Sequence, residues 1–182
     1  MELDRVLPDY DFRSRYTRRI SAAPDEVWRA VMELTAEELP VARTLMRLRS
    51  AGRTRLDGPL IDAFPTPTLL VREGSELVKG KIAKFWRMSP QTAPVAPGDP
   101  DQFASFDAPG WAKAALGLRV EPDGDGALLV FETRVRGTDA FARRVFAPYW
   151  LLIRAGGAGF IRLEILGAVA RRAERAAIAA PA

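Results

Sequence analysis

The chain has 182 residues and a mass of 20.0 kDa, with 48% apolar and 27% charged residues, which suits one globular domain and excludes collagen, coiled coil and wholesale disorder. It contains neither Cys nor His, so disulfides, thiolate nucleophiles, zinc ribbons, iron–sulfur clusters and His-dependent catalytic triads are excluded. The net charge is +4, but the basic residues form no block along the sequence, so we expect no nucleic-acid partner.

The first part of the chain is predicted to form a strand followed by two short helices. Residues 10–20 show the alternation of a strand that has one solvated face. Pro24 suits the first position of a helix, and Thr35 with Glu38 has the spacing of a capping box. The second helix is expected to turn three apolar residues inward: Val41, Leu45 and Leu48.

The middle of the chain is predicted to be a run of antiparallel strands. An irregular connection rich in Gly and Pro is expected over residues 50–67. The strands are expected over residues 68–72, 76–86, 111–122 and 127–137. Residues 88–110 contain five prolines and two glycines, too many for a regular element, and a loop of this kind is often a lid or a mobile flap.

The last part of the chain is predicted to be helical over residues 139–153 and 160–177, with a break at residues 154–157. This order of elements indicates an α+β fold in which a curved antiparallel sheet wraps around the long C-terminal helix. A helix held by a curved sheet leaves a space between the two, and such spaces bind apolar ligands. The sequence therefore predicts a cavity between the sheet and the C-terminal helix.

Several stretches resemble the START-like superfamily, also called the helix-grip fold, which includes polyketide cyclases and lipid-transfer domains. The opening YTRRISAAPDEVWRAVMEL is similar to the start of that fold, a strand that runs through Ala-Pro into a helix with a Val-Trp pair. A bacterial branch of the superfamily is similar to ELVKGKIAKFW, FASFDAPGWAKAALGLRV, LLVFETRV and PYWLLIRAGGAGFIRLEILGAVARRAE. The resemblance implies one START-like domain over residues 9–177, an N-terminal extension at 1–8 and a tail at 178–182. It implies no particular chemistry, because the superfamily hosts binders, carriers, cyclases and hydrolases.

A ligand pocket is predicted between the strand 127–137 and the helix that follows it. Alternation places Phe131 and Thr133 on the apolar face of the strand, and helical spacing places three residues of the helix on one stripe. Thr133 and Tyr149 are expected to be the polar contacts that orient a mostly apolar ligand. The expected ligand-binding residues are Trp86, Trp111, Phe131, Thr133, Phe141, Val145 and Tyr149.

Glu132 and Arg134 leave the same strand on the opposite face. Two interpretations stay open at this point. The two residues form either a polar pair inside the cavity, which would raise the case for catalysis, or a solvated ion pair on the outer face. The alternation rule favours the solvated pair.

The expected function is to bind a small apolar or amphipathic molecule without cofactor or metal. The alternatives are a cofactor-free enzyme of cyclase, dehydratase or hydrolase type that uses the same cavity, and a structural module without a ligand. Without His, few groups are available to stabilise developing charge, which disfavours the enzyme. Since neither a signal-peptide pattern nor a long apolar run is present, we expect a soluble cytoplasmic protein with no stable membrane insertion. The oligomeric state stays open.

Overall fold

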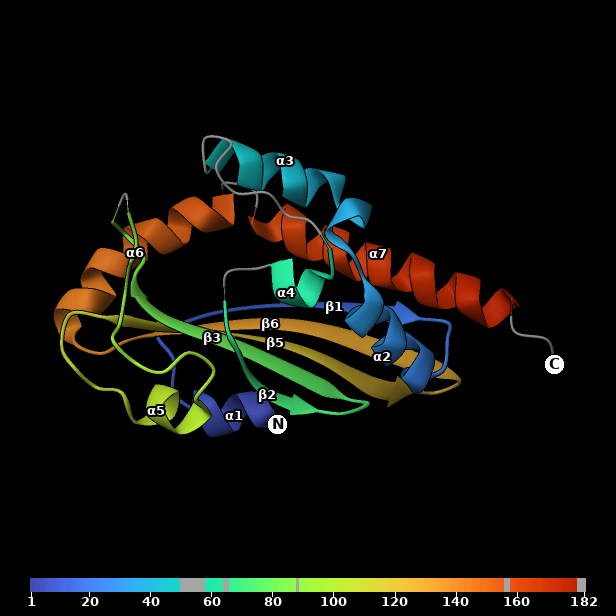
Figure 1. Ribbon diagram of the computed structural model, residues 1–182, viewed down its shortest axis with the longest axis horizontal. Helices are drawn as coiled ribbons and strands as arrows, with labels where there is room; N and C mark the ends of the chain where they lie inside the picture. Colours follow the sequence, from blue (N-terminus) through green and yellow to red (C-terminus); the bar gives the residue numbers. More distant parts are fainter. Residues whose placement is uncertain (50–57, 64–65, 88, 156–157, 180–182) are drawn as a thin grey trace. The chain divides into compact units, whose positions relative to one another are not determined.

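The computed structural model describes residues 1–49, 58–63, 66–87, 89–155 and 158–179 (Figure 1). In chain order the elements are α1 Glu2–Val6, β1 Phe12–Ile20, α2 Pro24–Glu33, the 3-10 helix η1 Ala36–Glu38, α3 Pro40–Arg49, α4 Leu60–Ala63, β2 Thr68–Arg72, β3 Glu76–Lys84, β4 Gln91–Thr92, α5 Pro100–Ser105, β5 Ala112–Asp123, β6 Gly126–Gly137, α6 Ala140–Ala155 and α7 Ala158–Ala179. Within the described ranges, the structure contains no helix with both the length and the apolar character that a membrane span needs.

The strands form one sheet in the order β1-β6-β5-β3-β2, and the short β4 pairs with β3. In the β2–β3 hairpin Val71 lies opposite Leu77, and the connecting turn falls at residues 73–75, as predicted. The β5–β6 hairpin turns at Gly124, whose φ of +63° is a left-handed conformation that glycine adopts without strain. The predicted α+β class is confirmed: within the described residues six strands form an open antiparallel sheet, the short helices α2 and α3 follow β1, and the last helix is the long α7.

The chain divides into two compact units, each assembled from separate segments. Unit 1 contains residues 1–15, 66–118 and 131–156, and unit 2 contains residues 16–65, 119–130 and 157–182. The single-domain boundary at 9–177 stays a prediction.

In unit 2, helices α2 and α3 both pack against α7. The carboxylate of Glu164 on α7 accepts hydrogen bonds from the backbone N–H groups of Val41 and Ala42, at 2.8 and 2.7 Å. This contact fixes the rotation of α3, so that the small Ala42 is buried while Val41 and Leu48 are exposed. The prediction that Val41 and Leu48 point inward is therefore wrong.

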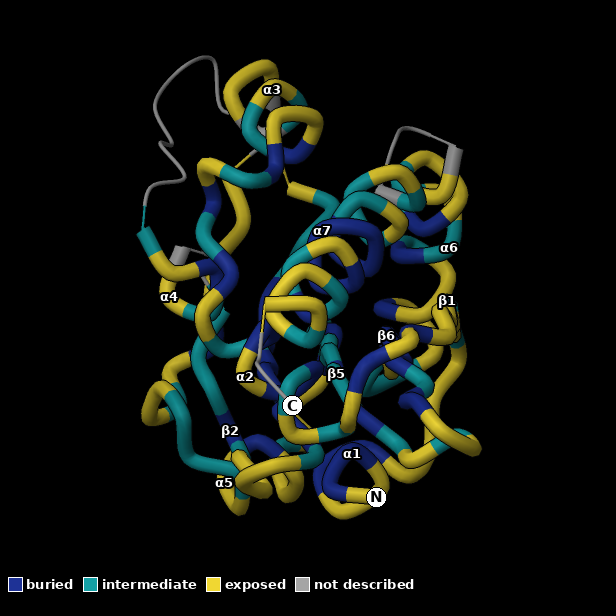
Figure 2. The backbone as a smooth tube through the Cα atoms, turned by 90° about the vertical axis from the view of Figure 1, so that its right-hand side faces the viewer, coloured by how far each residue is buried: buried dark blue, intermediate teal, exposed yellow. Residues whose placement is uncertain are grey.

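In unit 1, helices α1 and α5 contact each other and β3 (Figure 1). Leu3, Val6 and Leu7 from the N-terminal segment share a buried cluster with Ile82 and Phe103, which we call the α1–α5 cluster. Residues 1–8, which were predicted to be an N-terminal extension, thus contain a helix whose apolar residues are part of this core. Figure 2 colours part of α1 as buried.

The expectation of a structureless loop at 88–110 is wrong over β4 and α5, while residue 88 lies outside the described residues. Asp99 caps α5, because its Oδ1 accepts the backbone N–H groups of Asp101 and Gln102 at 3.0 and 2.9 Å. Pro100 takes the first helical position, where its missing N–H costs nothing. A proline counted as a helix breaker therefore begins a helix.

Two other predicted connections extend beyond the described residues. The irregular connection at 50–67 includes residues 50–57 and 64–65, and the helix break at 154–157 includes residues 156–157; these positions are not described. The short helix α4 lies within the first of these connections, between residues 57 and 64. The N–H of its first residue, Leu60, donates to the carbonyl of Leu34 at 2.7 Å.

Candidate functional site

Aromatic side chains gather between α6 and the sheet in unit 1. Phe146 and Trp150 of α6 are buried together with Ala112 of β5 and Val135 of β6. Partly buried apolar residues surround this centre: Phe12, Phe85, Trp86, Ala114, Tyr149 and Ile153. We call the whole group the aromatic cluster. The ring centre of Phe146 lies 5.2 Å from that of Phe12 and 5.5 Å from that of Tyr149, distances typical of favourable ring pairs.

The buried stripe of α6 is shifted by one residue along the sequence from the predicted one. Ala142, Phe146 and Trp150 are buried at four-residue spacing, whereas Phe141 is 61% exposed. Adjacent helix positions point about 100° apart, so burying the two large rings of Phe146 and Trp150 turns Phe141 toward solvent. The predicted inward orientation of Phe141 is wrong, and Val145 is only half-buried beside the stripe.

The structure brings some of the other predicted site residues together and separates one. Trp86 and Tyr149 both belong to the aromatic cluster. Phe131 and Thr133 are buried on β6, and alternation places them on the same face as Val135 of this cluster. Trp111 packs instead against the α1–α5 cluster.

A buried polar atom lies on the same side of the sheet. Ser14 is two residues after Phe12 on β1, so both side chains leave the same face of the strand. Its Oγ atom is buried and has no hydrogen-bond partner among the described residues. An unsatisfied buried hydroxyl costs about 1–3 kcal/mol, so a polar group that reached it would gain a hydrogen bond.

The opposite face of β6 carries a buried ionic group. Glu132 and Arg134 are only 3% and 4% exposed, and Arg134 Nε donates to Glu132 Oε1 at 2.7 Å. Arg13 donates twice to the Glu132 carboxylate, both at 2.9 Å, and Arg134 Nη1 donates to Asp4 Oδ1 at 2.7 Å. We call Asp4, Arg13, Glu132 and Arg134 the ionic cluster. The favoured interpretation of Glu132 and Arg134 as a solvated pair is wrong, although they do lie opposite the apolar face.

Helix α1 is the reason that this ionic pair is buried. The N-terminal segment lies over the pair, and the carbonyl of Leu7 accepts a further hydrogen bond from Arg134 at 3.1 Å. The start of α1 is held by the buried carboxylate of Glu76, which accepts the N–H groups of Glu2 and Leu3 at 2.9 and 3.2 Å. Glu2 also pairs with Arg72. Alternation along β6 could not reveal this cover, because it comes from the far end of the chain.

The surroundings of Glu132 change its ionisation. Burial by itself would raise the pKa of Glu132, but the hydrogen bonds from Arg13 and Arg134 outweigh burial and leave the pKa below its ordinary value. The hydrogen bond from Arg134 likewise lowers the pKa of Asp4. Both carboxylates are therefore charged partners of the arginines at neutral pH, and neither is suited to act as a general acid.

Lys113 is a second buried charge on this face of the sheet. Its Nζ donates to the carbonyls of Ala104 and Phe106 at 2.7 and 3.3 Å and lies 5.3 Å from the ring centre of Phe103. Burial lowers the pKa of Lys113 to about 8, and the positive charge of Arg136 adds to the effect. The lysine thus holds the end of α5 to the sheet.

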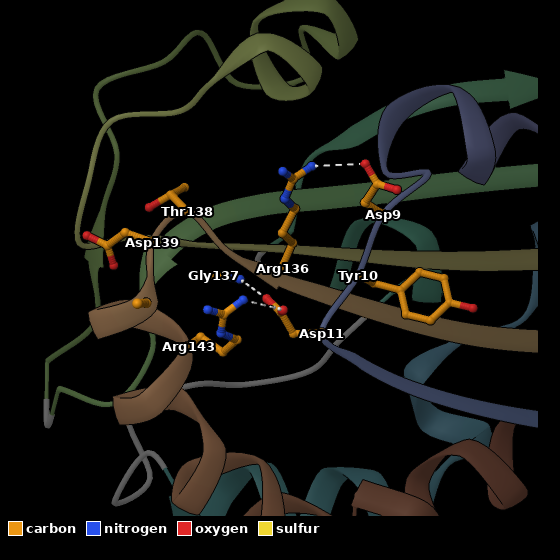
Figure 3. A pocket seen from close by; sticks show the side chains of 9 residues that line it. Asp9, Tyr10, Asp11, Arg136, Gly137, Thr138, Asp139 and Arg143 are labelled. Carbon is orange, nitrogen blue, oxygen red and sulfur yellow. Dashed lines mark hydrogen bonds and ion pairs between the residues drawn. The ribbon is translucent and has the colours of Figure 1, made fainter.

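A polar pocket of about 290 Å³ lies where β6 ends and α6 begins (Figure 3). Its lining consists of Asp9, Tyr10, Asp11, Arg136, Gly137, Thr138, Asp139, Ala140 and Arg143. We call it the α6 pocket. Gly137 is needed at its base, because a side-chain carbon there would come within 2.6 Å of the backbone nitrogen of Arg143.

Two carboxylates of the α6 pocket are already engaged with the backbone. Asp139 caps α6, since its Oδ1 accepts the N–H of Ala142 at 2.6 Å while its Oδ2 accepts the N–H of Gly110 at 2.9 Å. Asp11 accepts the N–H of Gly137 at 2.8 Å. These carboxylates hold the pocket in shape, which leaves them poorly placed to act as bases.

The two arginines of the pocket are held more loosely. Arg136 pairs with Asp9 and Arg143 pairs with Asp11, each at 3.4 Å, and the arginine side chains are 48% and 55% exposed. Figure 3 shows each guanidinium beside its aspartate at the pocket. This pocket was not predicted from the sequence. Asp139 before α6 could have been recognised as a helix cap, but the approach of residues 9–11 depends on contacts between segments that are distant in the sequence.

Comparisons with known proteins add little to these observations. No family model matches the sequence, and no curated protein matches it either. Among solved structures, MLL2253 from Mesorhizobium loti is 15% identical, covers 90% of this chain and 98% of that chain, and has a TM-score of 0.42. CV1439 from Chromobacterium violaceum is 14% identical over 92% and 99% of the two chains, with a TM-score of 0.38. Ara h 8.0201 is 12% identical over 87% and 97%, with a TM-score of 0.29. The fold assignment rests on the chain's own elements and strand order.

Proposed function

We propose that this protein binds a small apolar or amphipathic molecule at the aromatic cluster of unit 1. The observation that carries the proposal is the rim of partly buried aromatic side chains, including Trp86 and Tyr149, around the buried rings of α6. Small-molecule sites are concave and are lined mostly by apolar and aromatic side chains, with a few polar groups that orient the ligand. The hydroxyl of Ser14, buried without a partner among the described residues, is a polar group of this kind on the same face of the sheet.

Binding is favoured over catalysis because of the state of the nearby acidic groups. Asp11 and Asp139 of the adjacent pocket accept backbone hydrogen bonds, and Glu132 is paired with two arginines on the other face. Each carboxylate thus already has a structural role. A small molecule that is held intact, without conversion, is the outcome that this arrangement supports best.

The experiment compares two tryptophans that the sequence could not tell apart. Decanol is titrated into the protein by isothermal titration calorimetry at neutral pH. The variant Trp86→Ala should weaken binding roughly tenfold, the loss of about one well-packed aromatic contact. The matched variant Trp111→Ala, which removes an equal side chain from the α1–α5 cluster, should leave the affinity within about twofold.

The results separate this proposal from its alternatives. Equal losses in Trp86→Ala and Trp111→Ala, or no binding of decanol to the wild-type protein, would contradict the proposed site and favour a structural module. Native mass spectrometry of the freshly purified protein provides a second measurement. A copurified small molecule that is lost in Trp86→Ala and kept in Trp111→Ala supports the proposal.

A further inference from the structure

The α6 pocket and the aromatic cluster share helix α6. On the strands their residues are neighbours in sequence but leave opposite faces, since Asp11 directly precedes Phe12 and Arg136 directly follows Val135. On α6, Arg143 lies three residues before Phe146, which is roughly 4.5 Å along the helix axis at about 1.5 Å per residue. A molecule resting on the aromatic rim therefore has a polar pocket within reach at the start of the same helix.

The group that this pocket can offer such a ligand is the guanidinium of Arg143. Asp139 already accepts the N–H of Ala142 at the start of α6, so the helix terminus is not available to a ligand. The guanidinium of Arg143, in contrast, is held by an exposed ion pair of 3.4 Å with Asp11, whereas Arg136 pairs with Asp9 on the opposite face of β6. Exposed pairs of this length contribute little to stability, so an arginine loses little by exchanging its aspartate for a ligand group.

We infer that the α6 pocket takes the acidic group of an amphipathic ligand, a carboxylate in the simplest case, through the side chain of Arg143. The inference rests on the proposed function, because the apolar body of the same ligand lies on the aromatic cluster. A guanidinium presents a planar set of N–H donors that matches the two oxygens of a carboxylate. The ligand class is thereby narrowed from apolar molecules in general to amphipathic acids.

The experiment compares decanoate with decanol, which share one alkyl body and differ in the charged group. Both are titrated by calorimetry into the full chain at neutral pH and low salt, below the concentrations at which they aggregate. Decanoate should bind the wild-type protein roughly tenfold more tightly, which corresponds to about one charge-assisted contact. The variant Arg143→Gln should reduce this preference, while the affinity for decanol stays within about twofold.

A matched control comes from the next residue of α6. Arg144 is exposed and lies outside the lining of the pocket, so Arg144→Gln removes the same charge from the same turn without touching the site. The preference for decanoate should survive in this variant. Equal binding of both probes to the wild-type protein, or an equal loss of preference in Arg144→Gln, overturns the acidic-group site and leaves the proposed function intact. Failure of both probes to bind overturns the proposed function and the inference with it.

Discussion

The two faces of the sheet in unit 1 carry different kinds of buried side chain. Along β5, Ala112 and Ala114 belong to the aromatic cluster under α6, while Lys113 and Ala115 face the α1–α5 side. Along β6, Val135 joins the aromatic cluster and Arg134 points to α1. One face is thus closed by aromatic rings and the other by a short helix that lies over buried charges.

The contrast teaches that alternation and burial are separate pieces of information. Alternation correctly assigned Val135 and Arg134 to opposite faces. It could not say whether the polar face would be solvated, since that depends on a segment more than a hundred residues away in the sequence. Buried ion pairs are costly to assemble, and breaking one partner leaves an uncompensated charge. The two faces should therefore respond differently to substitution and to pH.

The largest effect is expected on the aromatic face, from Phe146→Ala. Phe146 is buried against the rings of Phe12, Tyr149 and Trp150, so its removal opens a hole in packed core. The free energy of unfolding, measured by urea denaturation, should fall by about 3–5 kcal/mol. Phe141→Ala, on the exposed side of the same helix, should change it by less than about 0.5 kcal/mol. A large fall in the free energy of unfolding of Phe141→Ala would instead support the buried stripe that was predicted from the sequence.

A slightly smaller effect is expected on the ionic face, from Arg134→Met. The variant leaves Glu132 buried, although Arg13 still donates two hydrogen bonds to it. The free energy of unfolding should therefore fall by about 3 kcal/mol, the low end for a broken buried pair. The double variant Glu132→Leu/Arg134→Met removes both charges and should recover most of the loss.

The comparison with Arg136 shows whether burial is the cause. Arg136 leaves β6 on the same face, but its ion pair with Asp9 is exposed. Arg136→Met should cost less than about 1 kcal/mol in the same denaturation experiment. If Arg136→Met and Arg134→Met were equally destabilising, the cover provided by α1 would have no energetic consequence.

The elements of the sheet were readable from the sequence because they depend on local signals. Alternation and turn residues located β2, β3, β5 and β6, and the Thr35–Glu38 capping box is present as predicted, with the N–H of Thr35 donating to Glu38 at 3.2 Å. The start of α5 also has a local signal, since Asp99 is a helix cap and Pro100 suits the first helical position. The helix was not predicted, because the high proline content of the segment indicated a loop.

The candidate site was only partly readable, because its parts meet through long-range contacts. Trp86 and Tyr149 were identified as site residues and do share the aromatic cluster. Phe141 was assigned to the wrong side of α6, because helical spacing fits more than one stripe of apolar residues. Which stripe is buried depends on which rings fill the core. The covering of Glu132 and the α6 pocket both depend on the path of residues 1–11, which no periodicity describes.

The two faces should also differ in their response to alkaline pH. Burial lowers the pKa of Lys113 to about 8, whereas an unfolded chain keeps a lysine near its ordinary value of about 10.4. Between these two values the unfolded chain binds more protons than the folded one, so the free energy of unfolding rises with pH. We expect the wild-type protein to gain about 1–3 kcal/mol relative to Lys113→Met over this interval, measured by urea denaturation at a series of pH values. Val135→Ala, on the aromatic face, should lower the curve uniformly without changing its slope. Parallel curves for the wild-type protein and Lys113→Met would contradict this prediction. They would show that Lys113 has the same pKa in the folded and the unfolded chain, and that the buried charges of the α1–α5 face do not make the free energy of unfolding depend on alkaline pH.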